Sequence, residues 1–282
     1  MRLEELLTQY YAPLKGIGSR TVRIYGFTLT AWADLLGRPP EVGDLEELEV
    51  ARFLSHRLAT RSVATAAKDR AQIRALWEFA VRRGLTDRWP QIRPIRVPER
   101  VPQAWLTDEL QRLLAAASER EGSIAGVPAA AFWRSSILVC YETGCRIGEL
   151  LGLEWRDVSP AGILFRAENR KGGRRDIFRP ISPPVAEALE AIRRDRPEVF
   201  AWDRCYSNLW RHLGMICKAA GLPNDRGSKF HRIRKTHASY AAAAGLDAQR
   251  LLDHASPVTT RGYLDPRIVR PPDATDVLPR VG

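Results

Sequence analysis

The sequence has few cysteines and no long hydrophobic run, and each shortage argues against a class of protein. Its four cysteines form no C-x-x-C pair, so neither a zinc ribbon nor a thioredoxin-type site is indicated. The longest charge-free run, Gly122 to Trp133, is shorter than the roughly 18 residues that a membrane-spanning helix needs. An acidic pair, Glu4 and Glu5, stands where a signal peptide would be positively charged. We therefore expect a cytoplasmic protein with no membrane partner.

Positive charge is what the sequence has in excess. The 44 Lys and Arg residues outnumber the 33 Asp and Glu residues, which gives a net charge of +11. Most of these cations are arginines, whose planar guanidinium bonds two phosphate oxygens at once. This balance points to a polyanionic partner such as nucleic acid. The 45% hydrophobic and 27% charged residues are ordinary for a globular protein, so disordered and fibrous classes are excluded.

A length of 282 residues predicts two domains, at roughly 150 residues each. The boundary is expected at residues 91–103, where prolines alternate with arginines and favour an extended chain. An arginine at every third or fourth position of an extended segment suits a linker that follows a phosphate backbone. A plain surface linker would fit the same pattern. The arginines expected to bind DNA here are Arg93, Arg96 and Arg100.

Residues 1–90 read as helices throughout. Apolar residues recur at helical spacing in 19–36, 45–58 and 62–82, and Ser62 or Thr65 could cap the third of these helices. Together they predict a small basic helical bundle, although a helical adaptor of another kind would look the same.

The second part, residues 104–282, is mainly helical with one interruption. Thr107 is expected to cap a helix, and residues 129–142 form a strongly apolar one. Residues 158–181 carry β-branched and aromatic residues around a glycine turn, which predicts a small hairpin or three-stranded sheet. The fold class is therefore mainly α with a small antiparallel β-sheet in the C-terminal domain. The Pro-rich tail from residue 265 is expected to be irregular.

Basic side chains gather in particular segments of this second part. Thr143 and Gly144 fit a helix start, which would place Arg146 and Glu149 on one face. An isolated Arg–Glu pair would also explain those two residues. The turn of the predicted hairpin holds four more basic residues, Arg170, Lys171, Arg174 and Arg175.

Three further basic or aromatic groups follow. His231, Arg234 and Lys235 would share one helical face. His254 lies just before a helix that Ser256 and Pro257 start, and Tyr263 is expected about two turns into it. Taken singly, such a histidine and tyrosine would be ordinary structural residues.

Taken in order, these segments resemble the tyrosine recombinase (phage integrase) family and are similar to bacterial Xer-type recombinases. That family carries T-G-x-R-x-x-E-L, a Lys on a β-hairpin, H-x-x-R, L-G-H, and a Tyr nine residues beyond the last His. The sequence has T-G-C-R-I-G-E-L from residue 143, H-R-I-R from residue 231, and Tyr263 nine residues after His254. It departs from the family at Asp253, where Gly is usual, and at Lys235, where His is frequent. The resemblance implies six catalytic residues, Arg146, Lys171, His231, Arg234, His254 and Tyr263.

The resemblance also implies an organisation and a reaction. A helical, SAM-like core-binding domain (1–90), a basic linker (91–103) and a catalytic domain (104–282) would form a two-domain clamp on double-stranded DNA. Tyr263 would attack a DNA phosphate to give a covalent 3′-phosphotyrosyl intermediate, with Lys171 as general acid and His231 as acceptor of the tyrosine proton. Arg146 and Arg234 would clamp the phosphate, with His254 as a further donor. No metal and no nucleotide cofactor would be required.

The expected function is site-specific DNA recombination or integration, as for phages and other mobile elements. Strand exchange between two sites implies a tetramer on paired DNA, from a protein that could be a monomer in solution. In the family, the segment after the tyrosine docks on a neighbouring subunit. Three alternatives remain: a catalytically inactive DNA-binding regulator on the same fold, a type IB topoisomerase-like enzyme, and an unrelated helix-turn-helix protein. Four residues besides the linker arginines are expected to contact DNA, Arg170, Arg174, Arg175 and Lys235.

Overall fold

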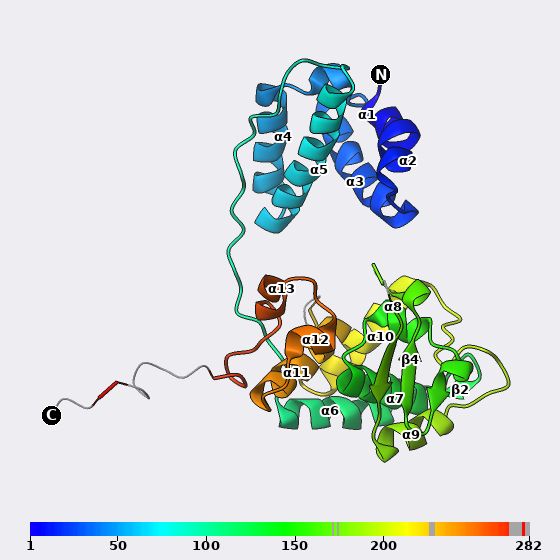
Figure 1. The fold of residues 1–282 in the computed structure, drawn as a ribbon. Helices are drawn as coiled ribbons and strands as arrows, with labels where there is room; N and C mark the ends of the chain where they lie inside the picture. The colour runs from blue at the N-terminus through cyan, green and yellow to red at the C-terminus, as the bar shows by residue number, and fades with distance from the viewer. Residues whose placement is uncertain (171, 174, 226–228, 271–277, 280–282) are drawn as a thin grey trace. The chain divides into compact units, whose positions relative to one another are not determined.

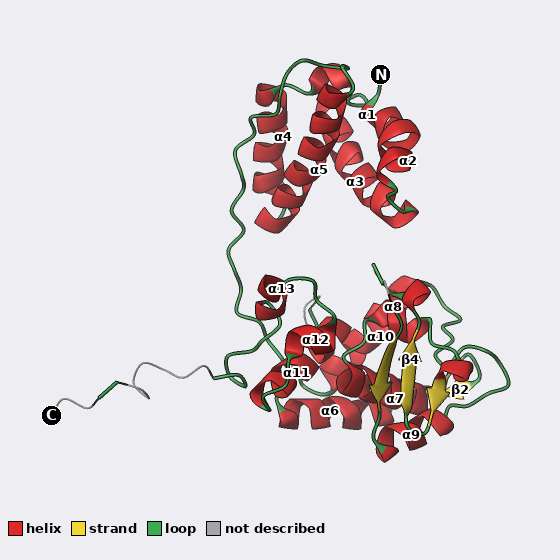
Figure 2. Cartoon of the chain, viewed as in Figure 1, coloured by secondary structure: helices red, strands yellow, loops and turns green. Residues whose placement is uncertain are grey.

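The computed structural model describes residues 1–170, 172–173, 175–225, 229–270 and 278–279. The chain divides into two compact units, Met1–Glu99 and Arg100–Gly282 (Figure 1). Helices predominate in both units, and the strands lie in the second (Figure 2). The expected class, mainly α with a small antiparallel sheet, is therefore confirmed. Among the described residues, no helix combines the length and apolar character needed to cross a membrane.

The first unit is a helical bundle around one apolar core. Gly37, with a φ of +69°, ends the helix Ser19–Leu36 in the left-handed conformation that glycine adopts most easily. The Ser62 hydroxyl accepts a 3.2 Å hydrogen bond from the Thr65 backbone N–H and so caps the last helix, as predicted. Trp32, Phe53 and Trp77 are fully buried between the helices. The elements are α1 (Leu3–Glu5), the π-helix η1 (Leu6–Tyr11), α2 (Ala12–Lys15), α3 (Ser19–Leu36), the 3-10 helix η2 (Val42–Asp44), α4 (Glu47–Thr60) and α5 (Val63–Arg82).

The first part of the predicted linker packs on this bundle. Ile92 and Ile95 lie against its core. The Arg70 guanidinium on α5 donates to the Arg93 carbonyl at 2.8 Å and also to the Ile92 carbonyl. The backbone is thereby held while the arginine side chains stay outside. The exposed linker arginines are Arg93, Arg96 and Arg100.

The second unit surrounds helix α7 (Ala129–Thr143), whose Phe132, Trp133 and Ile137 are buried. This helix packs against α6, α9 and α11, so its apolar residues on several faces are covered. Replacing a buried aromatic such as Trp133 by alanine would cost about 3–5 kcal/mol of stability. The other helices are α6 (Thr107–Ser118), α8 (Ile147–Leu151), α9 (Pro183–Glu190), α10 (Tyr206–Ala219), α11 (Phe230–Ala243), α12 (Ala248–Leu252) and α13 (Pro257–Arg261), with 3-10 turns η3 (Trp155–Asp157) and η4 (Ala167–Asn169).

Two small antiparallel sheets complete this unit. The strand order of the larger is β3 (Val158–Ser159), β4 (Gly162–Phe165) and β5 (Ile177–Pro180), with Phe165 opposite Ile177. The expected three-stranded sheet is therefore present, and its β4–β5 connection carries the basic turn. The smaller sheet pairs β1 (Ser123–Ile124) with β2 (Val127–Pro128).

Three local predictions were wrong, each because a neighbouring group supplies the cap or ends the helix. The first residue outside α6 is Leu106, whose N–H donates to the Glu109 carboxylate at 2.8 Å, so Thr107 is not the cap. The segment from Thr143 ends α7 instead of beginning a helix, because Gly144 adopts a φ of +61°. Tyr263 follows α13, which stops at Arg261, and is not inside that helix.

Candidate active site

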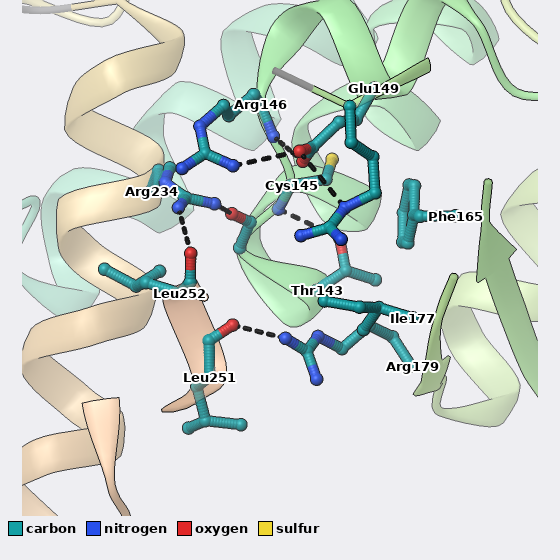
Figure 3. Close-up of a pocket in the computed structure, with 12 residues that line it drawn as sticks. Thr143, Cys145, Arg146, Glu149, Phe165, Ile177, Arg179, Arg234, Leu251 and Leu252 are labelled. Atoms are coloured by element: carbon teal, nitrogen blue, oxygen red, sulfur yellow. Dashed lines mark hydrogen bonds and ion pairs between the residues drawn. The ribbon is translucent and has the colours of Figure 1, made fainter. Parts of the chain in front are cut away.

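Segments far apart in the sequence meet in the second unit around a pocket between α8, α11, α12 and the β4–β5 hairpin. Figure 3 shows that arginine side chains from several of these elements line the pocket, with Arg146 beside Glu149 and with Arg234 and Arg179 beside Leu252 and Leu251. The residues lining the pocket are Thr143, Gly144, Cys145, Arg146, Glu149, Phe165, Arg170, Ile177, Arg179, Arg234, Leu251 and Leu252.

Arg146 precedes α8 and is oriented by Glu149. One Glu149 oxygen accepts the Arg146 backbone N–H at 2.7 Å, and the other accepts its guanidinium at 3.0 Å. Glu149 is buried, whereas 29% of the Arg146 side chain is exposed. The predicted pairing of the two residues is thus present. It fixes the guanidinium while leaving part of it open to a ligand.

Arg234, on α11, is a buried cation of the site. Its guanidinium donates to the Gly144 carbonyl and, at 2.7 Å, to the Leu252 carbonyl. Its Nε has no hydrogen-bond partner among the described residues, although the side chain is only 4% exposed. Burial and the nearby Arg146 charge lower the pKa of Arg234. A buried guanidinium with an unused N–H, beside a second cation, suits an anionic ligand.

His254 lies next to Arg234 and is held on both ring nitrogens. Its Nε2 is 3.3 Å from the Arg234 guanidinium, and its Nδ1 is 3.1 Å from the Thr260 hydroxyl. A guanidinium can only donate, so Nε2 accepts and Nδ1–H donates to Thr260. The side chain of Gln249 also donates to the His254 carbonyl at 3.1 Å. The imidazole is therefore fixed in orientation and tautomer.

The Tyr263 ring lies between two imidazoles. Its centroid is 4.8 Å from that of His231 and 4.7 Å from that of His254, both edge-on. The guanidinium carbon of Arg234 is 5.9 Å from the same ring. The Tyr263 backbone is held by its N–H bond to the Thr260 carbonyl at 2.8 Å. The tyrosine of this chain thus reaches the arginine and the histidines of the same chain.

The residues after Tyr263 are tied to the start of the second unit. Buried Asp265 accepts the Ala104 backbone N–H at 2.7 Å and an Arg267 guanidinium N–H at 2.7 Å. Arg267 also donates to the Ala104 carbonyl at 2.9 Å. The chain just after the tyrosine is thus packed on its own domain as far as these residues, and residues 265–270 form turns with no helix or strand, in line with the irregular tail that the sequence predicts.

The remaining predicted residues fall into different environments. Lys171 and Arg174 lie outside the described residues. Lys235 is half-buried, and burial lowers its pKa. Arg175 is exposed, with a guanidinium nitrogen 3.3 Å from an Asp253 oxygen. Arg170, expected to contact DNA, has a side chain only 4% exposed and pairs with carboxylates instead.

His237 is a neighbour of the site that sequence reasoning missed. Its Nδ1–H donates to the Tyr141 carbonyl at 2.9 Å. A Cβ at Gly144 would come within 2.5 Å of its ring, so this contact as well as the positive φ requires glycine there. No spacing in the sequence signals the contact, because the two residues meet only through the packing of α7 on α11. Among the described residues, no cluster of three or more His, Cys, Asp or Glu side chains could hold a metal ion.

The histidines of the site are uncharged at neutral pH. Burial lowers the pKa of His237 and His254 to about 4 each, and loss of water around the partly exposed His231 ring lowers its pKa to about 4 as well. The positive charges of Lys235 and Arg234 add to the effect at His231. Neutral imidazoles can accept a proton, which is the property that a base beside a phenol needs.

We expect the free energy of unfolding to fall as the pH is lowered from about 6.5 towards 4. In that window the unfolded chain binds protons on these three histidines that the folded chain does not, so stability increases with pH. Denaturant unfolding at a series of pH values measures the slope. His237→Gln should make the slope shallower, because it removes one of the three groups. A stability independent of pH between 6.5 and 5 would contradict the assignment.

Comparisons with known proteins agree with this geometry. The sequence model of the Phage integrase family matches residues 105–268. The tyrosine recombinase XerD of Mycobacterium tuberculosis is 29% identical over 281 residues, covering 88% of each chain. A lambda integrase dimer bound to a COC′ core site has a similar fold, with a TM-score of 0.73 at 21% identity over 99% of this chain and 81% of that chain. A lambda integrase tetramer bound to a Holliday junction gives 0.72 at 21% identity, covering 95% and 78%. Because the family match spans more than half of the sequence, the chain belongs to the phage integrase family of tyrosine recombinases.

Proposed function

We propose that this site-specific recombinase cuts and rejoins DNA strands through Tyr263 as the nucleophile. The observation that carries the proposal is the placement of the Tyr263 ring between two neutral imidazoles and beside Arg234, whose buried Nε has no partner among the described residues. A phenol, a base and a pocket for an oxyanion are the three parts that nucleophilic attack on a phosphodiester needs.

The reaction is balanced without an external cofactor. The Tyr263 oxygen forms a bond to phosphorus while the bond from phosphorus to the 5′-oxygen breaks, which leaves a 3′-phosphotyrosyl link and a free 5′-hydroxyl. His231 takes the phenolic proton, and Lys171 gives one to the departing 5′-oxygen. Attack by another 5′-hydroxyl reverses these steps and joins the strands. The phosphodiester energy is stored in the covalent link throughout.

The two arginines have different parts in this scheme. The Arg234 guanidinium is enclosed and already anchored by backbone carbonyls, so it presents a fixed charge to the phosphate. Arg146 is held by Glu149 at one side and is partly exposed at the other. Together they would stabilise the charge that develops on the non-bridging oxygens, while His254 orients the Arg234 guanidinium through its Nε2.

The function is tested by trapping covalent adducts on duplexes of random sequence and sequencing the attached DNA. We expect the adducts to be enriched in one DNA sequence, the target site. Recombination should occur only between two copies of that site. Relaxation of supercoiled DNA lacking the site would instead indicate a topoisomerase. An absence of adducts from every sequence would indicate a binding protein without catalysis.

We also propose that the first unit is the core-binding domain and that both units contact the duplex, with the exposed linker arginines on its phosphates. We expect the triple neutralisation of Arg93, Arg96 and Arg100 to weaken the salt dependence of binding. In a plot of log binding constant against log salt concentration, the slope should become shallower by about 0.9 for each phosphate contact that is lost. Titrations of a labelled duplex at several salt concentrations measure this slope. The control for net charge is a triple variant at exposed arginines that form ion pairs: Arg52→Gln, Arg74→Gln and Arg156→Gln. A linker variant with the wild-type slope would show that the linker does not touch DNA.

A tetramer on two paired sites is the proposed active assembly, since each of four strands needs one tyrosine. The lambda integrase tetramer on a Holliday junction supports it through a similar fold. We expect truncation after Arg270 to leave binding of one half-site intact, because the contacts of Asp265 and Arg267 with Ala104 are kept. Assembly of protomers on a full site should weaken, because the truncation removes the apolar residues Val277, Leu278 and Val281. Gel-shift assays on half and full sites distinguish the two effects, and unchanged assembly and recombination would exclude a role for the tail.

A further inference from the structure

The residues just before His254 are held by four arginines from three parts of the fold. Arg179 of β5 donates to the Leu251 carbonyl, and Arg234 of α11 donates to the Leu252 carbonyl at 2.7 Å. The next residue along the chain, Asp253, is held through its side-chain carboxylate and not through its backbone carbonyl. Carbonyls at a helix end have no partner within the helix, so cations that bond them fix the end of α12. Figure 3 shows two of these bonds, from Arg179 and Arg234.

The third held residue is Asp253, whose backbone is unusual. Its φ of +50° lies in the left-handed region, which is unfavourable for an aspartate and easy for a glycine. An aspartate in this conformation needs a compensating contact. Its two carboxylate oxygens provide one, at 2.7 Å from the Arg170 guanidinium and 3.3 Å from that of Arg175. Both arginines belong to the β4–β5 connection, 83 and 78 residues earlier in the chain.

Arg170 is the centre of this contact. Its side chain is only 4% exposed, and it also donates to the Arg175 carbonyl at 2.9 Å, which closes the turn. Its Nε is 3.6 Å from the Glu149 carboxylate that orients Arg146. Charges therefore alternate in an unbroken row of four side chains, from the proposed phosphate clamp to the residue before His254. These residues are Arg146, Glu149, Arg170 and Asp253.

We propose that Asp253 is a positioning residue which, by holding Arg170, orients the basic turn for protonation of the leaving 5′-oxygen. Arg170 directly precedes Lys171 in the sequence, so the Asp253 carboxylate holds the residue next to the proposed general acid. The inference rests on the proposed function, in which Lys171 is the general acid. It gives the departure from glycine at position 253 a mechanistic role: the carboxylate links the turn to the segment that carries His254.

The experiment compares single-turnover cleavage of two duplexes that contain the enriched site. One has an ordinary phosphodiester at the scissile position, and the other has sulfur in place of the leaving 5′-oxygen. A thiolate leaves without being protonated, because the pKa of a thiol is about 8.5, far below that of an alcohol. The full-length protein is used with Asp253→Gly, which relieves the backbone, and Asp253→Asn, which keeps the shape and removes the charge.

We expect both variants to cleave the ordinary duplex at least about tenfold more slowly, part of the roughly 10²–10⁴-fold that a general acid supplies. On the sulfur-containing duplex they should match the wild-type rate. Adding Arg170→Gln to Asp253→Asn should cause little further loss, because the carboxylate acts through that arginine. The matched control is Asp247→Ala, which removes the cap at the other end of α12 and should show no difference between the two duplexes.

Equal loss on both duplexes would reduce Asp253 to a structural residue and overturn the inference. Wild-type cleavage rates of the variants on both duplexes would also overturn the inference. Circular dichroism and melting temperature establish that each variant is folded. If Asp253→Asn does not fold, the test is carried out with Asp253→Gly alone. A wild-type protein that cleaves neither duplex would instead contradict the proposed function itself, so the two failures are distinguishable.

Discussion

Tyr263→Phe should abolish the covalent protein–DNA adduct while leaving DNA affinity unchanged. The substitution removes only the phenolic oxygen, which is the atom proposed to attack phosphorus. The ring contacts with His231 and His254 are available to phenylalanine as well. The fold and the pocket should therefore survive.

Adducts are measured as protein that stays attached to labelled DNA after denaturation. Tyr240→Phe is the matched control, since that hydroxyl is 3.0 Å from the Thr107 hydroxyl and is not in contact with the proposed site. It should form adducts at the wild-type rate. An undiminished adduct yield from the Tyr263→Phe protein would remove Tyr263 from the role of nucleophile.

Replacing Arg146 or Arg234 by alanine should slow cleavage by about 100-fold or more. Each contributes an N–H donor to the developing phosphate charge, and loss of one such donor costs roughly 3 kcal/mol of transition-state stabilisation. Arg146→Ala should act on the rate alone, because its side chain is partly exposed and, among the described residues, bonds only Glu149. Arg234→Ala should also lower the melting temperature, because it leaves the Gly144 and Leu252 carbonyls without their donor.

Single-turnover rates and melting temperatures separate the two effects. Arg193→Ala is the control for loss of an arginine, since this exposed side chain pairs with Glu190 and lies over Trp155, away from the pocket. It should cleave like the wild type. A retained rate in either the Arg146 or the Arg234 variant would exclude that arginine from the transition state.

Much of the fold followed from local sequence signals. Ser62 caps α5, Ser256 and Pro257 start α13, and residues 158–181 form a three-stranded sheet, all as the sequence predicted. Such features depend on backbone and side-chain chemistry within a few residues, so they can be predicted from the sequence. The wrong helix start at Thr143 has the same origin, because a Thr-Gly pair is compatible with either end of a helix until the preceding residues are known to be helical.

The order of the motifs was also contained in the sequence, and it led to the family. The sequence by itself therefore determined the class of reaction and six candidate residues. It did not determine how they are held, because those contacts join distant segments. Asp265 meets Ala104 across 161 residues, and Arg170 meets Asp253 across 83. Arg170 shows the difference most clearly. In the sequence, a basic residue in a glycine-rich turn indicates a solvent-facing phosphate contact. Only the packing of that turn against α12 buries the Arg170 side chain and places it beside the Asp253 carboxylate.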